Sequence, residues 1–267
     1  MSLLSVLYVP NSPTLIGDVG MGARHTETER VLKECGASVQ GRVRTIVVLT
    51  PHFVTRKSLG LVTQVPLRQV YDFQGFPDAL FQVRYEPPGA PETGRRLEKL
   101  CADRSIPLRE VPEWGLDHGA WSALLHLFPK ADVPVLPLSI CPDLGPAAHT
   151  GLGAAVRELA REEDLMVLAT GSIIHNFRLL SGGHPEELAR AREYLATVER
   201  SLTAGHWEGV WGAPTELHRA ASPEGGDLPL RFLEGVVGDK FRAKVLAEES
   251  LLQALSMTTL AFTLLPE

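Results

Sequence analysis

Three polar side chains, Asn11, His52 and His175, each follow a short apolar run of this sequence. A fourth candidate, His118, lies in a DHG turn that opens a predicted helix. Imidazole nitrogens bind Fe(II) and Zn(II) and also transfer protons near neutral pH, so these histidines suit metal or acid–base chemistry. If the apolar runs are neighbouring parallel strands, the first three side chains meet at the carboxyl edge of the sheet, where open α/β sheets bind ligands. The sequence therefore predicts an active site at that edge.

Each of these histidines also has a structural interpretation, because a histidine at a strand end can cap a helix or bond a backbone carbonyl. Their recurrence at equivalent positions of the predicted topology favours the functional interpretation for the set. His126 falls on the helix after the DHG turn, where packing or surface exposure is expected. The histidines in polar segments are predicted to be solvent-exposed: His25, His149, His184, His206 and His218.

Other kinds of catalysis fit the sequence less well. It contains no GxSxG nucleophile elbow, no P-loop and no GxGxxG dinucleotide-binding motif. In a serine hydrolase, Ser172 would be the nucleophile and His175 its base. Two residues this close on one loop rarely reach the geometry that this requires, and no acid that would orient the histidine is evident. Imidazoles with a carboxylate instead fit the two-His, one-carboxylate face of non-haem Fe(II) sites, and zinc accepts the same ligands.

Short apolar runs alternate with helical patterns along the chain, which predicts an α/β fold. The predicted strands are residues 4–9, 44–50, 59–64, 133–140, 165–170 and 257–265. The predicted helices, with apolar residues three and four apart, are 25–38, 91–103, 119–128, 146–162 and 185–204. Several strand runs are continuously apolar, which is typical of strands in a mostly parallel sheet with helices on both faces.

Two segments rich in Gly, Pro and aromatic residues, 64–90 and 205–229, are predicted to be long loops at one edge of the sheet. Aromatic, Pro-rich loops more often pack over a site than link two domains. We therefore expect residues 1–267 to form a single domain, with active-site loops at the carboxyl edge of the sheet.

Composition limits the partners and the location of the protein. The chain has 267 residues, is 44% hydrophobic and carries a net charge of −6, which argues against binding to nucleic acid or to an anionic membrane. No apolar stretch approaches the roughly 20 residues of a membrane-spanning helix, and the N-terminus is typical of a strand rather than a signal peptide. Three scattered cysteines do not indicate a disulfide framework, so a cytoplasmic protein is expected.

The sequence around these residues resembles the class III extradiol ring-cleavage dioxygenases, the LigB-like family, and most closely their DOPA-dioxygenase-like branch. The resemblance implies an enzyme that uses Fe(II) and O2, without an organic cofactor, to cleave a catechol-type ring next to its two hydroxyls. Zinc occupies the same site in some members. The order and spacing of these segments carry the resemblance: TPHF (50–53), YDFQGFP (71–77), YEPPGAP (85–91), WGLDHGAW (114–121), VPVLPLSI (133–140), GSIIHN (171–176) and SPEGGDLPL (222–230).

Carried over to this chain, the resemblance implies roles for individual residues. His52 matches a metal-binding histidine of the family, and His175 matches the histidine that acts as acid and base. His118 matches a further active-site histidine that contacts substrate or oxygen. Four aromatic side chains are expected to wall the substrate ring, with ordinary loop packing as the alternative: Tyr71, Phe73, Phe76 and Trp121.

Two positions depart from the family pattern. The family has a metal histidine after the first strand, where this chain has Asn11 in the segment PNSP. The third metal ligand of the closest branch is a histidine shortly before LPL, where this chain has Gly225 and Gly226. The adjacent Asp227 is the expected carboxylate ligand, as in other branches of the class. An amide oxygen is a weaker ligand for Fe(II) than imidazole, so these departures bear directly on catalysis.

Three functions therefore stay open. The main expectation is an Fe(II)-dependent dioxygenase that acts on a small aromatic diol or aminophenol with O2. One alternative is a catalytically degenerate member, acting as a small-molecule binding protein or as the partner subunit of an intact homologue. Another is a zinc-dependent hydrolase on the same scaffold. The class commonly assembles as dimers or larger, so a homo-oligomer or a paired homologous subunit is expected.

Overall fold

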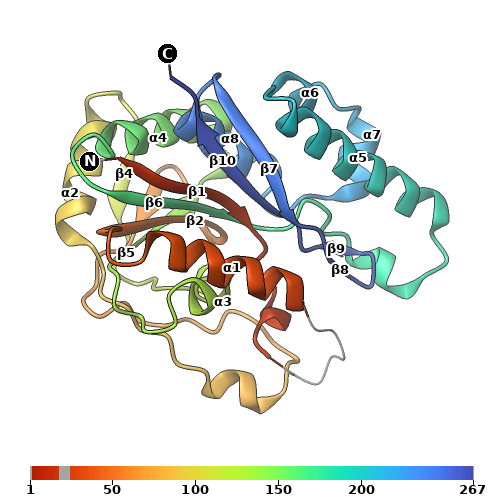
Figure 1. The fold of residues 1–267 in the computed structure, drawn as a ribbon, viewed down its shortest axis with the longest axis horizontal. Helices are drawn as coiled ribbons and strands as arrows, with labels where there is room; N and C mark the ends of the chain where they lie inside the picture. The colour runs from red at the N-terminus through yellow and green to blue at the C-terminus, as the bar shows by residue number, and fades with distance from the viewer. Residues whose placement is uncertain (1, 18–24, 267) are drawn as a thin grey trace.

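Eight strands form the central sheet in the computed structural model, which describes residues 2–17 and 25–266 (Figure 1). Their order across the sheet is β4-β3-β5-β2-β6-β1-β10-β7. A separate hairpin contains β8 (Ser250–Leu251) and β9 (Leu255–Ser256). The strands of the main sheet are β1 (Leu3–Val9), β2 (Thr45–Val54), β3 (Leu59–Leu61), β4 (Leu108–Glu110), β5 (Val135–Ile140), β6 (Leu165–Thr170), β7 (Phe241–Ala247) and β10 (Thr259–Leu264).

The four central strands, β5, β2, β6 and β1, all run parallel. Every residue of β5 and β6 is buried, as expected for strands covered on both faces. Alternate side chains enter two separate cores, so that Val6 and Tyr8 pack on one face of the sheet while Leu7 and Val9 pack on the other. Because β2, β6 and β1 are adjacent and parallel, their carboxyl ends meet at one edge of the sheet.

The sheet is mostly parallel, as predicted, and its flanks make it a mixed sheet. β10 lies between β1 and β7 and runs antiparallel to both, and β3 runs antiparallel to β5. The sequence pattern does not predict β4 or β7. Their sequences, LRE and FRAKVLA, lie at the two ends of the sheet, where exposed polar side chains interrupt any continuous apolar run.

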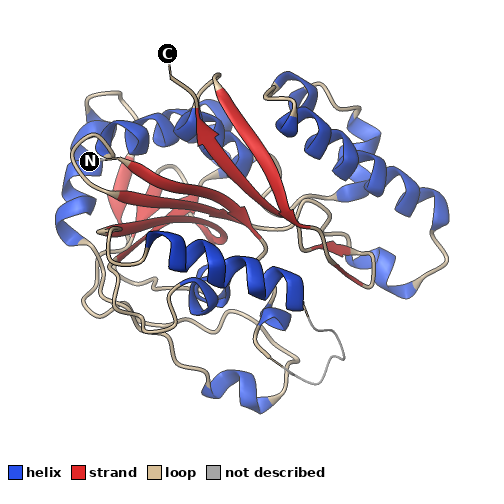
Figure 2. Cartoon of the chain, in the orientation of Figure 1, coloured by secondary structure: helices blue, strands red, loops and turns tan. Residues whose placement is uncertain are grey.

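Helices cover both faces of the sheet, and the whole chain forms one α/β domain (Figure 2). The helices on one face are α1 (Thr26–Val39) and α3 (His118–Leu127). Those on the other face are α2 (Pro91–Ala102), α4 (Gly145–Leu159) and α8 (Leu228–Val237). Beside β7, at the end of the sheet, lie α5 (Pro185–Thr203), α6 (Glu208–Trp211) and α7 (Thr215–Ala221).

The prediction of a loop over residues 205–229 is wrong, because this segment contains α6 and α7. Both helices are short, so they show too few turns to reveal a helical period. The sequence also does not predict α8, for a different reason. Its apolar residues do recur three and four apart, as at Leu230, Leu233 and Val237, but the helix begins inside the segment 205–229, which was predicted to be a loop.

The long segment between β3 and α2 remains largely irregular, as predicted, with one 3-10 turn at Asp78–Gln82. Two hydrogen bonds fasten this segment over α3. Trp121 Nε1 donates to the Val70 carbonyl at 3.0 Å, and Tyr85 Oη donates to the Phe128 carbonyl at 3.1 Å. The segment is therefore held at the carboxyl edge of the sheet, where it delivers the YDFQGFP residues.

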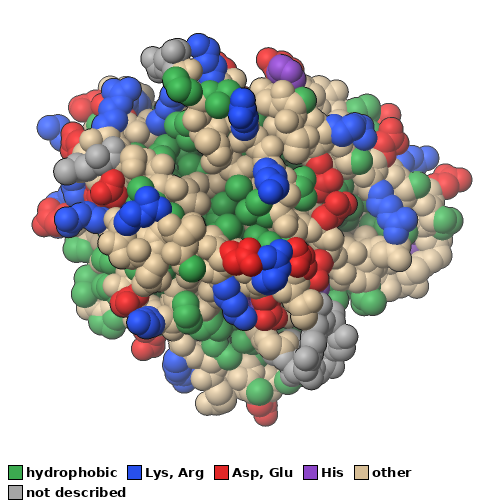
Figure 3. Space-filling model, in the orientation of Figure 1, with side chains coloured by type: hydrophobic (Ala, Val, Ile, Leu, Met, Phe, Trp, Pro, Cys, Tyr) green, Lys and Arg blue, Asp and Glu red, His purple; other side chains and the backbone are tan. Residues whose placement is uncertain are grey.

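The surface is mixed in charge. On the face shown in Figure 3, Lys and Arg side chains are interspersed with Asp and Glu.

Within residues 2–17 and 25–266, no helix has both the length and the apolar character needed to cross a membrane. The large apolar side chains that remain exposed are Val54, Val65, Phe177, Leu180 and Leu252.

Candidate metal centre and acid–base site

Asn11, His52, His118 and His175 line one cavity of about 400 Å³ at the carboxyl edge of the sheet. Asn11 follows β1, His52 lies near the end of β2, His175 follows β6, and His118 begins α3. The order of the parallel strands therefore brings together the four side chains that the sequence singled out, although they come from distant parts of the chain.

His52 lies between two carboxylates that were not expected from the sequence. Its Nδ1 is 2.9 Å from Asp72 Oδ2, and its Nε2 is 2.7 Å from Glu224 Oε1. Burial lowers the pKa of His52, but the hydrogen bonds to Asp72 and Glu224 outweigh burial and raise the pKa to about 10. In the metal-free protein His52 is therefore an imidazolium ion. A metal ion would take the place of its Nε2 proton, because ligation needs a neutral imidazole.

Asp72 holds two histidines at once. Its Oδ1 accepts hydrogen bonds from the His118 backbone N–H at 2.9 Å and from His118 Nδ1 at 2.8 Å, while Oδ2 accepts from His52. The backbone bond caps α3, whose own N-cap residue, Asp117, makes no capping bond. Burial raises the pKa of Asp72, but the bonds from His118 and His52 outweigh it and hold the pKa well below its usual range. Asp72 thus fixes both rings.

The DHG sequence brings α3 into direct contact with β2. A Cβ atom on Gly119 would lie 2.4 Å from Thr50 Oγ1 and 2.8 Å from Cδ2 of His52, so the close approach requires glycine. Asp117 is fully buried and accepts hydrogen bonds from Thr50 Oγ1 at 2.8 Å and Trp114 Nε1 at 3.1 Å. The turn therefore fixes His118 against His52, with ring centroids 4.1 Å apart.

Glu224 lies in the turn ahead of α8 and is locked to the segment after β6. Its backbone N–H donates to the Ser172 carbonyl at 3.0 Å, and the Ser172 N–H donates to Glu224 Oε2 at 3.1 Å. Gly225 follows with a φ of 71°, a left-handed conformation that favours glycine and shapes this turn. Burial raises the pKa of Glu224, but the hydrogen bond with His52 and the nearby His175 outweigh burial and lower it.

Asp227, the carboxylate expected to bind metal, is not among the residues that line the cavity. Its Oδ1 accepts a hydrogen bond from His218 Nε2 at 2.9 Å. The turn through Gly225 and Gly226 separates it from His52, and the carboxylate that reaches the histidine belongs to Glu224. The structure thus places Glu224, rather than Asp227, beside His52. Glu224 lies in the same SPEGGDLPL segment, which carries the resemblance but does not single out one of its two carboxylates.

His175 is held on the segment after β6. Its backbone N–H donates to the Ala221 carbonyl at 2.9 Å, and it forms a bridge with Leu255 of β9. Its Nε2 lies 3.7 Å from Glu224 Oε1. Burial lowers the pKa of His175, and this effect exceeds the opposing effect of Glu224. A neutral imidazole in this position can take a proton from a bound substrate.

Asn11 is buried beside the cavity, and part of its amide group lacks a well-aligned partner. Its backbone carbonyl accepts a hydrogen bond from Ser122 Oγ at 3.2 Å, which fixes the residue against α3. Its Nδ2 is buried with no hydrogen bond of ordinary geometry among the described residues, yet the amide lies close enough to Glu224 to lower the pKa of that carboxyl. A buried N–H group without a good acceptor costs about 1–3 kcal/mol, which is unusual and fits a group that faces a binding site.

Two overlapping sets of side chains could hold a metal ion, and both contain His52. His52, Asp72 and His118 each offer one ligand atom within 4.8 Å of the others. His52 Nε2, Glu224 and Asn11 form the second set, on the other side of the His52 ring. Asp72 already accepts three hydrogen bonds on its two oxygens, so the second set, with the carboxylate of Glu224 and the amide oxygen of Asn11, fits a metal better. Asp72 then holds the non-ligating nitrogen of His52, as carboxylates commonly do beside metal sites.

The structure separates the four aromatic residues that were expected to wall the substrate. Phe73 and Phe76 line the cavity, and the Phe73 ring centroid lies 5.2 Å from that of His118. Tyr71 and Trp121 are not among the lining residues. Trp121 is fully buried, and the Tyr71 hydroxyl donates to the Val83 carbonyl at 2.5 Å, so both support the loop from behind.

Two histidines expected to be solvent-exposed, His25 and His149, are buried instead. His25 Nε2 lies 3.0 Å from Thr14 Oγ1. His149 Nε2 accepts a hydrogen bond from the Cys141 N–H at 3.1 Å, and its Nδ1 donates to the Gly145 carbonyl at 2.7 Å. Burial lowers the pKa of both histidines. The polar residues beside them in the sequence concealed this packing, because solvent exposure depends on the neighbours in space.

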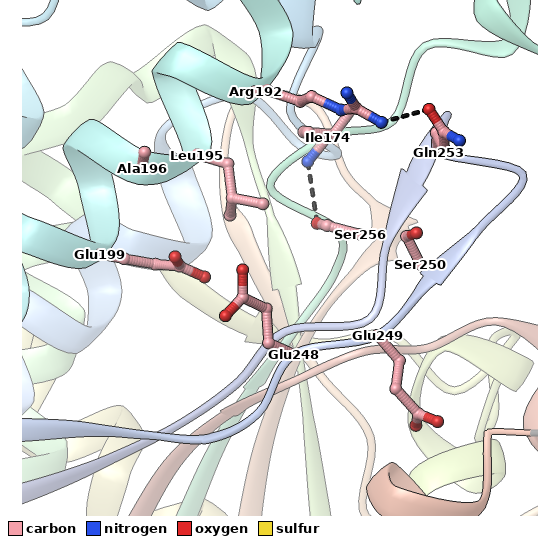
Figure 4. Close-up of a pocket in the computed structure, with 10 residues that line it drawn as sticks. All are labelled: Ile174, Arg192, Leu195, Ala196, Glu199, Glu248, Glu249, Ser250, Gln253 and Ser256. Carbon is pink, nitrogen blue, oxygen red and sulfur yellow. Dashed lines mark hydrogen bonds between the residues drawn. The ribbon is translucent and has the colours of Figure 1, made fainter.

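A second cavity, of about 290 Å³, lies between α5 and the connection from β7 to β8 (Figure 4). The carboxylates of Glu199 and Glu248 face each other across it, and Thr258 Oγ1 donates to Glu199 Oε1 at 3.2 Å. Burial and the negative charge of Glu248 raise the pKa of Glu199 to about 7. The described residues that line this cavity include no histidine or cysteine.

Replacing Glu199 with glutamine should stabilise the protein at pH 8 and leave its stability nearly unchanged at pH 5. The folded pKa of about 7 exceeds the ordinary value of 4.5, so the folded protein binds this proton more tightly and loses stability as pH rises through that window. Glu199 is half-buried, and solvent screening reduces the expected gain to about 1 kcal/mol, or about 2–4 °C in Tm.

Thermal unfolding of both proteins at the two pH values measures this effect. Glu193→Gln, on the exposed side of the same helix, is the matched control and should leave the Tm at pH 8 unchanged. Equal Tm values for the two variants at pH 8 would contradict the assignment of the shifted group.

Comparison with known proteins relates this site to one family. The family described as "Catalytic LigB subunit of aromatic ring-opening dioxygenase" matches residues 6–262. The 4,5-DOPA dioxygenase extradiol of Escherichia coli (strain K12) is 33% identical over 191 residues, which cover 70% of this chain and 67% of that protein. The 4,5-DOPA dioxygenase extradiol of Beta vulgaris is 30% identical over 211 residues, 76% of each chain.

A solved structure shares the fold over nearly its whole length. The crystal structure of an uncharacterized protein from Escherichia coli K12 superposes with a TM-score of 0.72 and 23% identity, covering 97% of this chain and 99% of that one. The family match spans almost the entire sheet, including the strands that carry Asn11, His52 and His175 to one edge. This chain therefore belongs to the LigB family of class III extradiol dioxygenases.

Proposed function

We propose that this protein is an Fe(II)-dependent extradiol dioxygenase that cleaves a catechol-type ring beside its hydroxyls with O2. One observation carries the proposal. His52 Nε2 and Glu224 Oε1 lie 2.7 Å apart on one side of the cavity, and the neutral His175 lies beside them. This arrangement combines a potential metal-binding pair with a proton acceptor, which is what ring cleavage of a diol requires.

The metal ligands in this proposal are His52, Glu224 and Asn11. An imidazole and a carboxylate suit non-haem Fe(II), and Asn11 replaces the second imidazole of the common facial set with a weaker donor. Zn(II) accepts the same nitrogen and oxygen ligands. When bound, Fe(II) would supply a binding site for O2 and would make a catechol hydroxyl more acidic.

The side chains around the metal-binding pair have separate tasks. His175 takes a proton from a substrate hydroxyl and returns it later in the reaction, since its lowered pKa keeps the imidazole neutral. His118 donates from Nδ1 to Asp72, which leaves Nε2 for contact with the substrate or with oxygen. Phe73 and Phe76 cover one wall of the cavity, where they exclude water and hold an aromatic ring.

The proposal is tested by loading the purified protein anaerobically with Fe(II) and measuring iron content and O2 consumption with catechol. We expect about one iron per chain and O2 consumption that depends on catechol. A protein that binds iron but consumes no O2 with any member of a panel of catechols, protocatechuates and aminophenols would contradict the proposed reaction. The appearance of a coloured ring-cleavage product is an independent readout.

One observation favours a second candidate, a binding protein without a competent metal site. Asn11 stands where the resemblance implies a metal histidine, and its amide is only partly paired. Under this alternative the native protein binds little iron, whereas Asn11→His restores about one equivalent. Equal iron content in the native protein and in Asn11→His would instead support Asn11 as an adequate part of the site.

A further inference from the structure

Among the described residues, three of the five large apolar side chains that remain exposed lie at the mouth of the active-site cavity. Phe177, Leu180 and Leu252 are 59%, 38% and 67% exposed, and all three line this cavity. Exposing large apolar side chains to water is unfavourable, and a cluster of them beside a pocket is typical of a surface that binds an apolar ligand. Further inside, Leu251 and Leu255 continue the same apolar wall.

The position of Leu252 is held by the fold rather than by a free loop. The β8–β9 hairpin is fastened to the segment that carries His175, because the Ser256 N–H donates to the Ile174 carbonyl at 2.9 Å and the Ile174 N–H donates to Ser256 Oγ at 2.9 Å. Leu252 itself has a φ of 48°, a left-handed conformation that is unfavourable for leucine. A large apolar side chain kept exposed in a strained turn beside the site indicates a functional requirement.

The cavity carries more negative than positive charge. Its ionisable lining consists of the carboxylates Asp72 and Glu224 and the histidines that they hold. Among the lining residues within 2–17 and 25–266, none is Lys or Arg. The cationic His52 is already paired with Asp72 and Glu224, so a carboxylate substituent on the substrate would enter a largely apolar cavity without a free cation among these residues, which is costly.

The outer end of the cavity adjoins the reacting groups directly. The ring centroids of His175 and Phe177 lie 4.7 Å apart. A catechol bound with its hydroxyls at His52, Glu224 and His175 would place a ring substituent next to Phe177 when that substituent points toward the mouth. The substituent, rather than the diol, is the part of the substrate that the exposed apolar residues would contact.

We propose that the site selects catechols whose ring carries an uncharged, apolar substituent, and that Phe177, Leu180 and Leu252 hold this substituent at the mouth of the cavity. The proposal rests on the proposed ring-cleavage function and narrows its substrate class. Each methylene buried against these residues should raise kcat/KM about 4-fold, the equivalent of about 0.8 kcal/mol per methylene.

The test compares two substrates that differ mainly in charge: 3-(3,4-dihydroxyphenyl)propanoate and its methyl ester. Initial rates of O2 consumption by the Fe(II)-loaded protein give kcat/KM for each, with unsubstituted catechol as the reference. We expect kcat/KM for the ester to exceed that for the acid by about 30-fold or more, since an unpaired carboxylate costs about 1–3 kcal/mol beyond the loss of apolar contact. Comparable values for ester and acid, with catechol turned over, would overturn the substrate assignment while leaving the reaction intact.

A charge-insertion variant tests the residues themselves. Leu252→Lys places a cation at the mouth and should reduce the preference for the ester about 5-fold or more, chiefly by raising kcat/KM for the acid. Val65→Lys is the matched control, because Val65 is 66% exposed but does not line the cavity, and it should keep the preference of the native protein. A change in oligomeric mass in Leu252→Lys without any change in preference would show that the exposed residues contact another chain, which contradicts the proposal.

Binding measurements separate this proposal from the proposed reaction. Anaerobic calorimetry on the same protein gives dissociation constants for ester and acid without turnover. If no catechol is cleaved, the proposed reaction fails, and tighter binding of the ester would still support an apolar-substituent pocket. Equal affinities for ester and acid would overturn the selectivity whether or not cleavage occurs.

Discussion

Replacing His175 with glutamine should lower kcat for ring cleavage about 1,000-fold while leaving the iron content of the protein unchanged. General acid–base groups contribute about 10²–10⁴ to the rate, and His175 is the neutral imidazole beside the proposed metal-binding pair. Glutamine keeps hydrogen-bonding capacity but cannot take up a proton. The fold should survive, since the backbone bond from His175 to Ala221 and those of its neighbours Ile174 and Asn176 to the β8–β9 hairpin do not involve its ring.

The measurement is steady-state O2 consumption together with elemental analysis of iron. His184→Gln provides the control, because His184 is partly exposed, does not line the cavity and should keep kcat within about 2-fold of the native value. If His175→Gln retained full kcat with bound iron, the proton acceptor would have to be another group, and His118 would be the next candidate.

Replacing Glu224 with glutamine should weaken Fe(II) binding by at least about 100-fold and abolish turnover at micromolar iron. The substitution removes the negative charge that lies 2.7 Å from His52 Nε2, and a neutral amide is a poorer ligand for a divalent cation. Asp227→Asn is the matched control. Its carboxylate pairs with His218 outside the cavity, so iron affinity should stay within about 2-fold of the native value.

Asp72→Asn distinguishes the two sets of side chains that could hold the metal. If Asp72 only orients His52 and His118, its loss should weaken iron binding by about 10–100-fold, as for other outer residues of metal sites. Circular dichroism would check that α3, which Asp72 caps, is intact. A result in which Asp72→Asn loses iron entirely while Glu224→Gln keeps it would assign the metal to His52, Asp72 and His118 instead.

The sequence allowed the fold to be predicted where local patterns were strong. The continuous apolar runs of β5 and β6 and the five longer amphipathic helices were predicted to within a few residues. α8 and β7 escaped prediction although both carry a pattern. α8 has apolar residues three and four apart but begins inside a segment that was predicted to be a loop, and β7 alternates apolar and polar residues instead of forming a continuous apolar run.

The candidate site was predicted only in part. Histidines that follow apolar runs stand out in a sequence, and strand order then predicts that they meet. Carboxylates are common on every surface, so nothing in the sequence distinguished Asp72 or Glu224 from the other acidic residues, even though both lie inside segments that carry the family resemblance. For the same reason, the sequence analysis predicted Asp227 as the carboxylate ligand. Asp227 is close to Glu224 in the sequence, but in the structure it pairs with His218.

The sequence by itself determined the alternation of strands and helices, the family resemblance and the identity of the imidazoles, because these depend on residue type and spacing along the chain. Only the tertiary structure decided which carboxylates reach His52 and which exposed apolar residues gather at the mouth of the cavity. The physical reason is the range of the interactions. A hydrogen bond forms within about 3 Å, and the turn through Gly225 and the approach of Gly119 to β2 set those distances between segments far apart in the chain.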